Sequence, residues 1–178
     1  QAFHEVSEEL QGPGTLLVRP KIGVMLEVPA VIYQIPQLAK KVDFFSVGSK
    51  DLTQYLLAVD RNNTRVANIY NSYHPAVLNA LATISQQCAQ NQIPVTVCGE
   101  LACEPGGAVL LMAMGYRKLS MNAHNLRKIN WVIRNVSINE VEELLPSVLA
   151  SHHPSDVFTI VNQYLEGQDL GGLTRAGL

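Results

Sequence analysis

Two patterns of apolar and polar positions alternate along the chain. Four short runs, the first three largely apolar, are each followed by a stretch with its apolar residues at helical spacing. The runs that predict strands are residues 22–27, 44–48, 94–98 and 117–121. Apolar strands that alternate with helices are typical of a parallel sheet whose two faces are both covered. The pattern therefore predicts an α/β fold built from four strand–helix units.

Prolines and apolar faces mark the predicted helices. One helix starts near Pro29, because a first turn tolerates proline, and Pro36 is expected to interrupt it. A longer helix starts at Pro75. Its apolar positions lie on one face and are Val77, Leu78, Leu81, Ile84 and Cys88. This face predicts a helix that packs on the sheet.

The pattern changes after residue 135. Two further helices are predicted there, the first with its N-cap at Ser137 or Asn139, and a glycine-rich ending follows them. Four strand–helix units make half of a (β/α)8 barrel of the TIM type, or a small open sheet. We expect residues 1–135 to form the barrel half, residues 136–166 to pack on it as helices, and residues 167–178 to form a flexible tail.

Composition and charge exclude several classes of function. The chain has 178 residues, 47% of them hydrophobic, which suffices for one core. A formal net charge of −2 argues against nucleic acid or an anionic membrane as a partner. The longest apolar run, residues 108–114, is too short to cross a bilayer, and residues 1–10 do not resemble a secretion signal. Three cysteines without such a signal predict no disulfide framework, so we expect a cytoplasmic protein.

Polar side chains gather where the predicted strands end. They are Glu27, then residues 49–51, then residues 98–100, then residues 120–122. In a barrel and in an open α/β sheet alike, the carboxyl ends of parallel strands form one edge, where ligands bind. The sequence therefore predicts a functional site at this edge.

Glu27 and Asp51 each have a structural and a functional interpretation. A glutamate next to a helix N-terminus is mildly stabilised by the helix dipole, and Asp51, followed by Gln54, has the pattern of a capping box. Capping alone does not explain why carboxylates end two successive strands. Neighbouring strands lie about 5 Å apart, which brings such groups within reach of one cation. Two carboxylates, with waters and a substrate phosphate, are the usual ligands of Mg²⁺.

Arg61 and Cys98 have similar pairs of interpretations. Arg61 is either a surface arginine paired with Asp60 or a bidentate clamp on a metal-bound phosphate. Cys98 is either a small core residue or a thiol acid, since a nearby helix N-terminus eases ionisation from an ordinary pKa of about 8.5. The residues alone predict a metal-and-phosphate site with a possible thiol acid.

Several blocks in order carry a resemblance to a known family. They are I-G-V-M-L-E-V-P, D-F-F-S-V-G-S-K-D-L-T-Q-Y, A-V-D-R-N-N, H-P-A-V-L, V-C-G-E-L-A and K-L-S-M. They resemble the C-terminal half of the phosphoenolpyruvate-binding barrel of enzyme I, the phosphoenolpyruvate–protein phosphotransferase of the sugar phosphotransferase system. The ending G-G-L-T-R-A-G-L resembles the nitrogen-regulatory branch in particular.

The resemblance implies a role for each residue at the edge. Glu27 and Asp51 are expected to ligate Mg²⁺, and Arg61, with Lys50 and Asp51, to bind phosphoenolpyruvate. Cys98 is expected to protonate C3 of the enolate after the phosphoryl group leaves. The reaction would be metal-assisted transfer of a phosphoryl group to a histidine, with pyruvate as the second product.

Two departures from the family pattern limit this expectation. Family members usually have asparagine where this chain has Lys50, whose ammonium either pairs with phosphate or repels Mg²⁺. The family's phospho-accepting histidine and the region that meets the histidine phosphocarrier protein have no counterpart here, so the isolated chain is expected to be inactive. An unpaired edge on the first strand, residues 22–27, predicts a homodimer.

Two alternatives to this enzyme remain open. One is a non-catalytic dimerisation and regulatory module of the same protein. The other is a related barrel enzyme that uses pyruvate or phosphoenolpyruvate, such as phosphoenolpyruvate synthase or a citrate-lyase-type enzyme.

Overall fold

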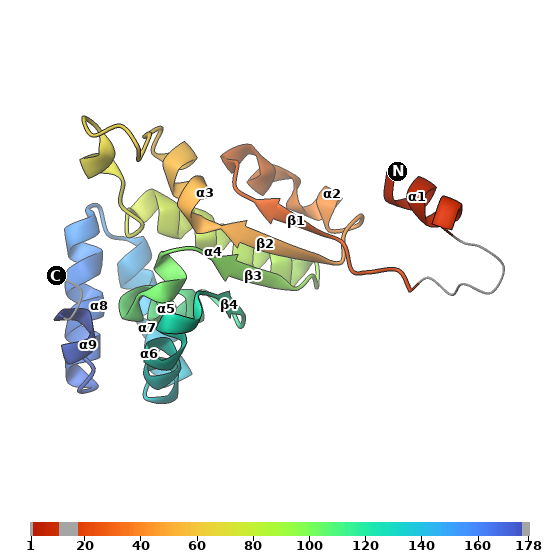
Figure 1. Ribbon diagram of the computed structural model, residues 1–178. Coiled ribbons are helices and arrows are strands. Elements are labelled where there is room, and N and C mark those ends of the chain that lie inside the picture. The colour runs from red at the N-terminus through yellow and green to blue at the C-terminus, as the bar shows by residue number, and fades with distance from the viewer. Residues whose placement is uncertain (1, 11–17, 176–178) are drawn as a thin grey trace.

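Four parallel strands form the centre of the chain. The computed structural model describes residues 2–10 and 18–175 (Figure 1). The strands are β1 (Gly23–Leu26), β2 (Phe44–Gly48), β3 (Val95–Cys98) and β4 (Leu119–Ser120). They pair in the order β1-β2-β3-β4, and every pairing is parallel. The α/β class and all four predicted strands are confirmed, as is the succession of strand and helix that half of a barrel requires.

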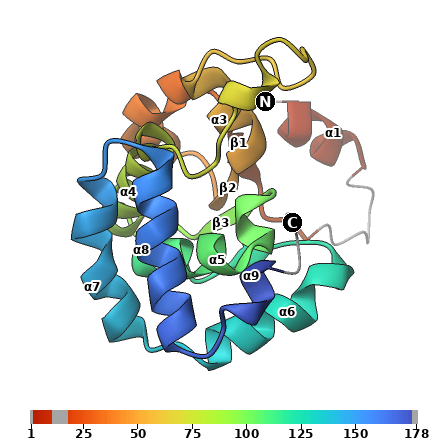
Figure 2. The ribbon, with the colours of Figure 1, turned by 90° about the vertical axis from the view of Figure 1, so that its left-hand side faces the viewer.

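Helices follow each strand and continue beyond the last one. The helical elements, with 3₁₀ helices labelled η, are α1 (Ala2–Leu10), η1 (Pro29–Gln34), α2 (Ile35–Leu38), α3 (Ser49–Leu56), η2 (Ala67–Ile69), α4 (Pro75–Gln90), η3 (Leu101–Cys103), α5 (Pro105–Ala113), α6 (Ala123–Arg134), α7 (Ile138–Leu149), α8 (Pro154–Gly167) and α9 (Gly172–Arg175). Figure 2 shows α4, α5 and α6 following the curve of the sheet on one side. Among the described helices, none has the combination of length and apolar character that crossing a lipid bilayer requires.

The two faces of the sheet differ in burial. Side chains of a strand point alternately to opposite faces, so the register of the strands sorts them. Leu26, Val47 and Val97 lie side by side on the helix-covered face and are fully buried. Met25 and Cys98 belong to the opposite face, where Met25 is 50% exposed and Cys98 is half-buried. The prediction that both faces are covered is therefore wrong for residues 18–175, although the parallel pairing that it supported is present.

The core lies between the sheet and the helices. The predicted apolar face of α4 is confirmed, since each of its five residues is at most 1% exposed. Helix α5 is buried along nearly its whole length and contacts α6, α7 and α8. A short apolar helix without a polar face needs such enclosure, because its exposed surface would otherwise remain in water.

Pro36 does not interrupt a helix as predicted. A 3₁₀ segment runs from Pro29 to Gln34, and α2 begins at Ile35 with Pro36 in its first turn. The first turn is where a missing N–H costs least. The break in the helix therefore precedes the proline.

Ser137 is the N-cap residue of α7, as one of the two alternatives predicted, although its side chain makes no capping bond.

The C-terminal residues pack more closely than a flexible tail would. Leu170 is 3% exposed and α9 contacts α5, so the part of 167–178 before residue 176 is anchored. Residues 176–178 lie outside the described part. The division at residues 135 and 166 stays a prediction.

Candidate functional site

The predicted site lies at the carboxyl ends of the strands. Figure 2 views the molecule from this end, with α3 near β1 and β2 and with α5 below β3. We call this edge the rim and define it by the residues that carry its charges and its thiol. These are Glu27, Lys50, Asp51, Arg61, Cys98 and Glu100.

Glu27 directs its side chain toward the neighbouring strand. It follows the last residue of β1, and Leu26 pairs with Val47 of β2. A Cβ placed on Gly48 would lie 2.6 Å from Glu27 Oε1 and 2.7 Å from its Cγ. The glutamate therefore lies over the backbone of Gly48, where α3 begins, and a larger residue at position 48 would displace it. Glu27 caps no helix, since the N-cap residue of η1 is Val28.

Asp51 does not cap α3, which corrects one of the two interpretations of this residue. The helix begins at Ser49, and its N-cap residue is Gly48 without a side-chain bond. The strand passes directly into the helix, so Asp51 lies in the first turn of α3 rather than before it. Its carboxylate is still favoured there by the helix dipole, yet it is free to bind another group.

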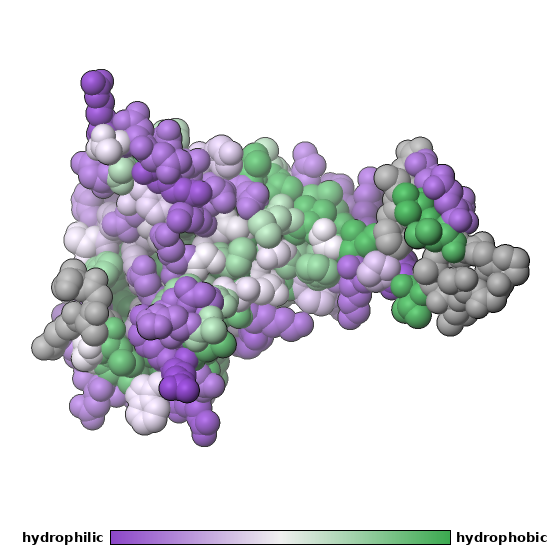
Figure 3. Space-filling model, viewed as in Figure 1, coloured by the Kyte–Doolittle hydropathy of each residue, from purple (hydrophilic) through white to green (hydrophobic). Residues whose placement is uncertain are grey.

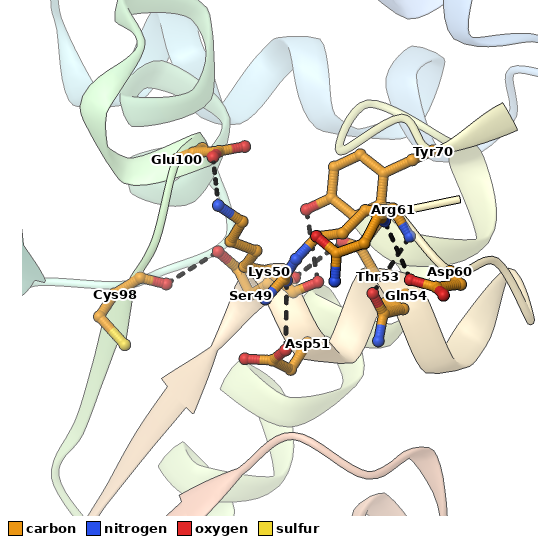
Figure 4. A network of polar contacts seen from close by, with 11 residues as sticks. Ser49, Lys50, Asp51, Thr53, Gln54, Asp60, Arg61, Tyr70, Cys98 and Glu100 are labelled. Atoms are coloured by element: carbon orange, nitrogen blue, oxygen red, sulfur yellow. Dashed lines mark hydrogen bonds and ion pairs between the residues drawn. The ribbon is translucent and has the colours of Figure 1, made fainter. Parts of the chain in front are cut away.

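The partner of Asp51 is Arg61 rather than a backbone amide (Figure 4). Arg61 Nη1 lies 3.1 Å from Asp51 Oδ1, and the Arg61 side chain is 29% exposed. The backbone N–H of Arg61 donates to Gln54 Oε1 at 3.3 Å, which ties the irregular segment after α3 back to the helix. Arg61 Nη1 is itself buried and has no hydrogen-bond partner in the described chain. The ion pair thus leaves the N–H groups of a buried guanidinium nitrogen without an aligned acceptor.

Lys50 points to the other side of the rim. Its Nζ donates to Glu100 Oε1 at 2.7 Å, and the two side chains are 40% and 55% exposed. The backbone oxygen of Lys50 accepts a bond from the Tyr70 hydroxyl at 3.3 Å. Figure 4 shows Glu100, Lys50, Arg61 and Asp51 around the first turn of α3. The rim therefore alternates between acidic and basic groups.

Cys98 is attached to α3 through its backbone. Its carbonyl oxygen accepts a bond from Ser49 Oγ at 2.8 Å, and its Sγ donates to the Val47 carbonyl at 3.3 Å. The next residue, Gly99, has a φ of +117°, and a Cβ there would overlap with Ser49 Oγ. Only glycine allows the loop after β3 to approach α3 so closely. The thiol is free and half-buried, at the end of β3 that adjoins Gly48.

The fourth strand end does not join the rim in the same way. Asn122 is the N-cap residue of α6, and its side chain accepts a bond from the Asn125 N–H at 3.1 Å. Its polar group is thus used by the helix that follows. All four strand ends were expected to contribute to one site. The ends of β1, β2 and β3 lie at the rim, and the end of β4 does not contribute a side chain to it.

Sequence reasoning missed the parts that Glu100 and Tyr70 play in the rim. Glu100 follows a strand end, and an acid there opposite Lys50 was a usable signal. Tyr70 comes from the irregular connection between α3 and α4, about which local patterns say nothing. Its contact with Lys50 depends on the path of that connection.

The rim offers two carboxylates to a metal ion. Among the described residues, no three His, Cys, Asp or Glu side chains converge in a way that would hold a metal ion. A divalent ion at Glu27 and Asp51 would therefore need water or ligand oxygens to complete its shell. Mg²⁺ is usually held in this manner, by one or two carboxylates together with waters and phosphate oxygens. Carboxylates are a ligand type that Mg²⁺ takes, so the residue types of Glu27 and Asp51 are compatible with this ion.

Comparisons with known proteins agree with the geometry. A family profile described as "PEP-utilising enzyme, PEP-binding domain" matches residues 1–138. Over 178 residues the chain is 44% identical to an Escherichia coli K12 protein described as "Phosphoenolpyruvate-dependent phosphotransferase system", which covers 100% of the chain and 23% of that protein. Over 145 residues it is 38% identical to the phosphoenolpyruvate-protein phosphotransferase of Borreliella burgdorferi, covering 82% of the chain and 25% of that protein.

A third relative has a different name. It is multiphosphoryl transfer protein 2 of Escherichia coli K12, 38% identical over 144 residues, with 81% of the chain and 17% of that protein covered. The chain spans about a quarter or less of the length of these relatives. The family profile covers well over half of the chain, and the chain therefore belongs to the family of phosphoenolpyruvate-binding domains of phosphoenolpyruvate-utilising enzymes.

Proposed function

We propose that the rim binds phosphoenolpyruvate with Mg²⁺ and that the chain is part of a phosphoenolpyruvate–protein phosphotransferase. In that reaction the phosphorus–oxygen bond of phosphoenolpyruvate breaks and a histidine nitrogen of another domain takes the phosphoryl group. The enolate left behind takes a proton at C3 and becomes pyruvate. The histidine phosphocarrier protein would receive the phosphoryl group next.

The observation that carries this proposal is the state of Arg61. Arg61 Nη1 is buried, and the Asp51 oxygen 3.1 Å away forms an ion pair with it but no aligned hydrogen bond, so its N–H groups are open to a better-placed acceptor. A phosphate oxygen would satisfy it, and arginine binds phosphate with several N–H groups in a fixed plane. Asp51 keeps the guanidinium in place until the ligand arrives.

The other residues of the rim have distinct roles in the proposal. Glu27 and Asp51 would hold Mg²⁺, which when bound neutralises phosphate charge during transfer. Gly48 leaves room for Glu27, and Ser49 fixes the loop that carries Cys98. Cys98 Sγ lies 3.3 Å from the Val47 carbonyl at the end of β3, and its thiol would give the proton to C3.

Calorimetry on the full-length protein tests the binding step. Titration with phosphoenolpyruvate in Mg²⁺ should show binding that Asp51→Asn weakens roughly tenfold or more, since the ion loses one of two carboxylates. Asp60→Asn is the matched control, because Asp60 is an exposed aspartate whose Oδ1 accepts only a local bond from Asn62. Undetectable binding in the unmodified protein would favour the non-catalytic module.

Exchange chemistry tests the role of the thiol. Cys98→Ala should abolish pyruvate formation, and proton exchange at C3 of pyruvate, while the variant keeps its fold and its affinity for phosphoenolpyruvate. Cys103→Ala is the control, since Cys103 Sγ donates to the Gly99 carbonyl at 3.4 Å and lies outside the rim. Unchanged exchange in Cys98→Ala would remove the thiol from the mechanism.

The nitrogen-regulatory branch, the cytoplasmic location and the homodimer stay predictions.

A further inference from the structure

We propose that Glu100 is a positioning residue that binds the Lys50 ammonium group while no ligand is present, and that Lys50 moves from Glu100 to the phosphate of a bound ligand. Lys50 would then supply part of the affinity for phosphate without a metal ion. This inference rests on the proposed phosphate site and names how its charge is regulated.

The first support is the geometry of the pair. Lys50 is the second residue of α3, and Glu100 follows Cys98 and Gly99 in the loop after β3. Their contact at 2.7 Å spans the entrance between two strand ends rather than two turns of one helix. The ammonium group is thus held beside the same first turn that carries Asp51 and its partner Arg61 (Figure 4).

The second support is the contrast between the base of Lys50 and its tip. Its backbone is held on both sides, by the Tyr70 hydroxyl at the Lys50 carbonyl and by the Ser49–Cys98 bond next to it. Its tip contacts one acceptor among the described residues, on the Glu100 side chain, which is 55% exposed. An ion pair this exposed to water contributes little to stability, so its release is nearly free of cost. A lysine side chain has enough rotatable bonds to change partners while its backbone stays fixed.

The third support is charge. The rim has three carboxylates, those of Glu27, Asp51 and Glu100. Figure 4 shows Asp51 and Glu100 beside the cations Lys50 and Arg61, and Glu27 lies over Gly48. Phosphate is a multiply charged anion, and it would meet repulsion from these acids unless a cation faces it. Both cations are paired, but Glu100 is 55% exposed and Asp51 is 37% exposed, so Lys50 is the cation that can change partner more readily and join Arg61 at the phosphate. Glu100 and phosphate therefore compete for one ammonium group.

Competition of this kind makes opposite predictions for the two partners. Lys50→Met removes a charge-assisted contact and should weaken binding of inorganic phosphate in EDTA roughly tenfold. Glu100→Gln releases Lys50 and should tighten that binding roughly threefold. The effect of Glu100→Gln should vanish in the Lys50→Met background, because Glu100 is proposed to act through Lys50.

The experiment is calorimetric titration of the full-length protein with inorganic phosphate, phosphoenolpyruvate and pyruvate, each in EDTA and in Mg²⁺. Phosphate and phosphoenolpyruvate should both respond to Lys50→Met, whereas pyruvate, which lacks phosphate, should not. Lys40→Met is the control, since Lys40 is an exposed lysine that follows α2, away from the rim. Circular dichroism and thermal unfolding confirm that each variant is folded.

Three results would overturn the inference. The first is the absence of phosphate binding in EDTA, and the second is phosphate binding that Lys50→Met leaves unchanged. The third is a gain from Glu100→Gln that persists in the double variant, which would mean that Glu100 acts only by its own charge. Loss of the Mg²⁺-dependent titration alone would overturn the proposed function, and the Lys50 effect in EDTA would still be measured separately.

Discussion

Two junctions of the molecule use polar side chains in opposite ways. At the rim, Lys50 pairs with Glu100 and Arg61 with Asp51, and all four side chains are 29% to 55% exposed. At the second junction, which we call the buried junction and define by Tyr73, Glu104 and Phe158, the Tyr73 hydroxyl donates to Glu104 Oε2 at 2.8 Å. The junction takes its name from Tyr73, which is 6% exposed, whereas Glu104 is half-buried and Phe158 is 45% exposed. The Tyr73 ring packs on Phe158 with centroids 4.8 Å apart.

The difference separates a binding surface from a structural contact. The Tyr73 hydroxyl is shielded from water, so its bond to the half-buried Glu104 meets less competition from solvent than the exposed ion pairs of the rim, which are screened. The buried junction links the start of α4, the start of α5 and the middle of α8. Removing it should therefore change stability, and changing the rim should alter ligand affinity. The predictions below test this contrast from the largest effect on stability to the smallest.

Gly107→Ala should destabilise the chain most. A Cβ on Gly107 would overlap with the Leu101 carbonyl, a backbone atom that a rotamer change does not move. We expect a loss of about 3 kcal/mol in the free energy of unfolding, from overpacking at the start of α5 next to the buried junction. Urea denaturation measures it.

Gly167→Ala is the control for that prediction. A Cβ there has no atom within 4 Å, and the position is helical, so alanine should be neutral or stabilising. Equal destabilisation by both substitutions would mean that packing against Leu101 is not the cause.

Alkaline pH should destabilise the core next. Burial raises the pKa of the Cys88 thiol from 9.0 to about 11, and burial also raises the pKa of Tyr116 well above its usual value. A raised pKa means that the unfolded state ionises first, so the stabilisation is complete below pH 9 and is lost as pH rises toward 11. For Cys88 the loss is about 2 to 3 kcal/mol.

Urea denaturation at a series of pH values measures this slope. Cys88→Ala should flatten it between pH 9 and 11, whatever the substitution does to stability at pH 7. A slope that is the same with and without Cys88 would contradict the assignment.

Tyr73→Phe should cost about 1 to 2 kcal/mol in the free energy of unfolding. It keeps the ring on Phe158 and removes the hydroxyl that donates to Glu104, whose carboxylate then lacks this donor. Tyr33→Phe is the control, because Tyr33 is 84% exposed and its hydroxyl faces water. Similar values for the two variants, measured by thermal or urea unfolding, would remove the distinction between buried junction and surface.

Lys50→Met and Glu100→Gln should have the smallest effects on stability. Each should shift the free energy of unfolding by less than about 0.5 kcal/mol, since the pair that they break is exposed and screened. Urea unfolding in low and in high salt measures the contribution of the ion pair to the free energy of unfolding. A loss as large as that of Tyr73→Phe would place the pair among the structural contacts and weaken the proposed exchange of partners by Lys50.

Much of the fold follows from local patterns in the sequence. The four strands lie within their predicted ranges, and the buried face of α4 is the predicted one, because side-chain period and backbone period are properties of each segment. The position of Glu27, Lys50, Asp51 and Cys98 at the rim follows as well. Parallel strands end at one edge, so polar residues at those ends are neighbours whatever their separation along the chain.

Sequence patterns did not decide which partner each rim residue takes. Asp51 had a capping-box pattern, yet the N-cap residue of α3 is Gly48, three residues earlier, because β2 leads into the helix without a loop. The sequence also did not show that one face of the sheet is left uncovered. A short apolar run is compatible with one buried face as well as with two.

The sequence by itself therefore determined the elements, their order and the edge where chemistry gathers. Only the tertiary structure decided that Arg61 pairs with Asp51, Lys50 with Glu100 and Tyr73 with Glu104. The first depends on the path of the irregular connection after α3, and the other two join segments that are tens of residues apart. Local propensities act over a few residues, whereas such contacts are set by how strands and helices pack together, and the free energy of that packing has no local pattern.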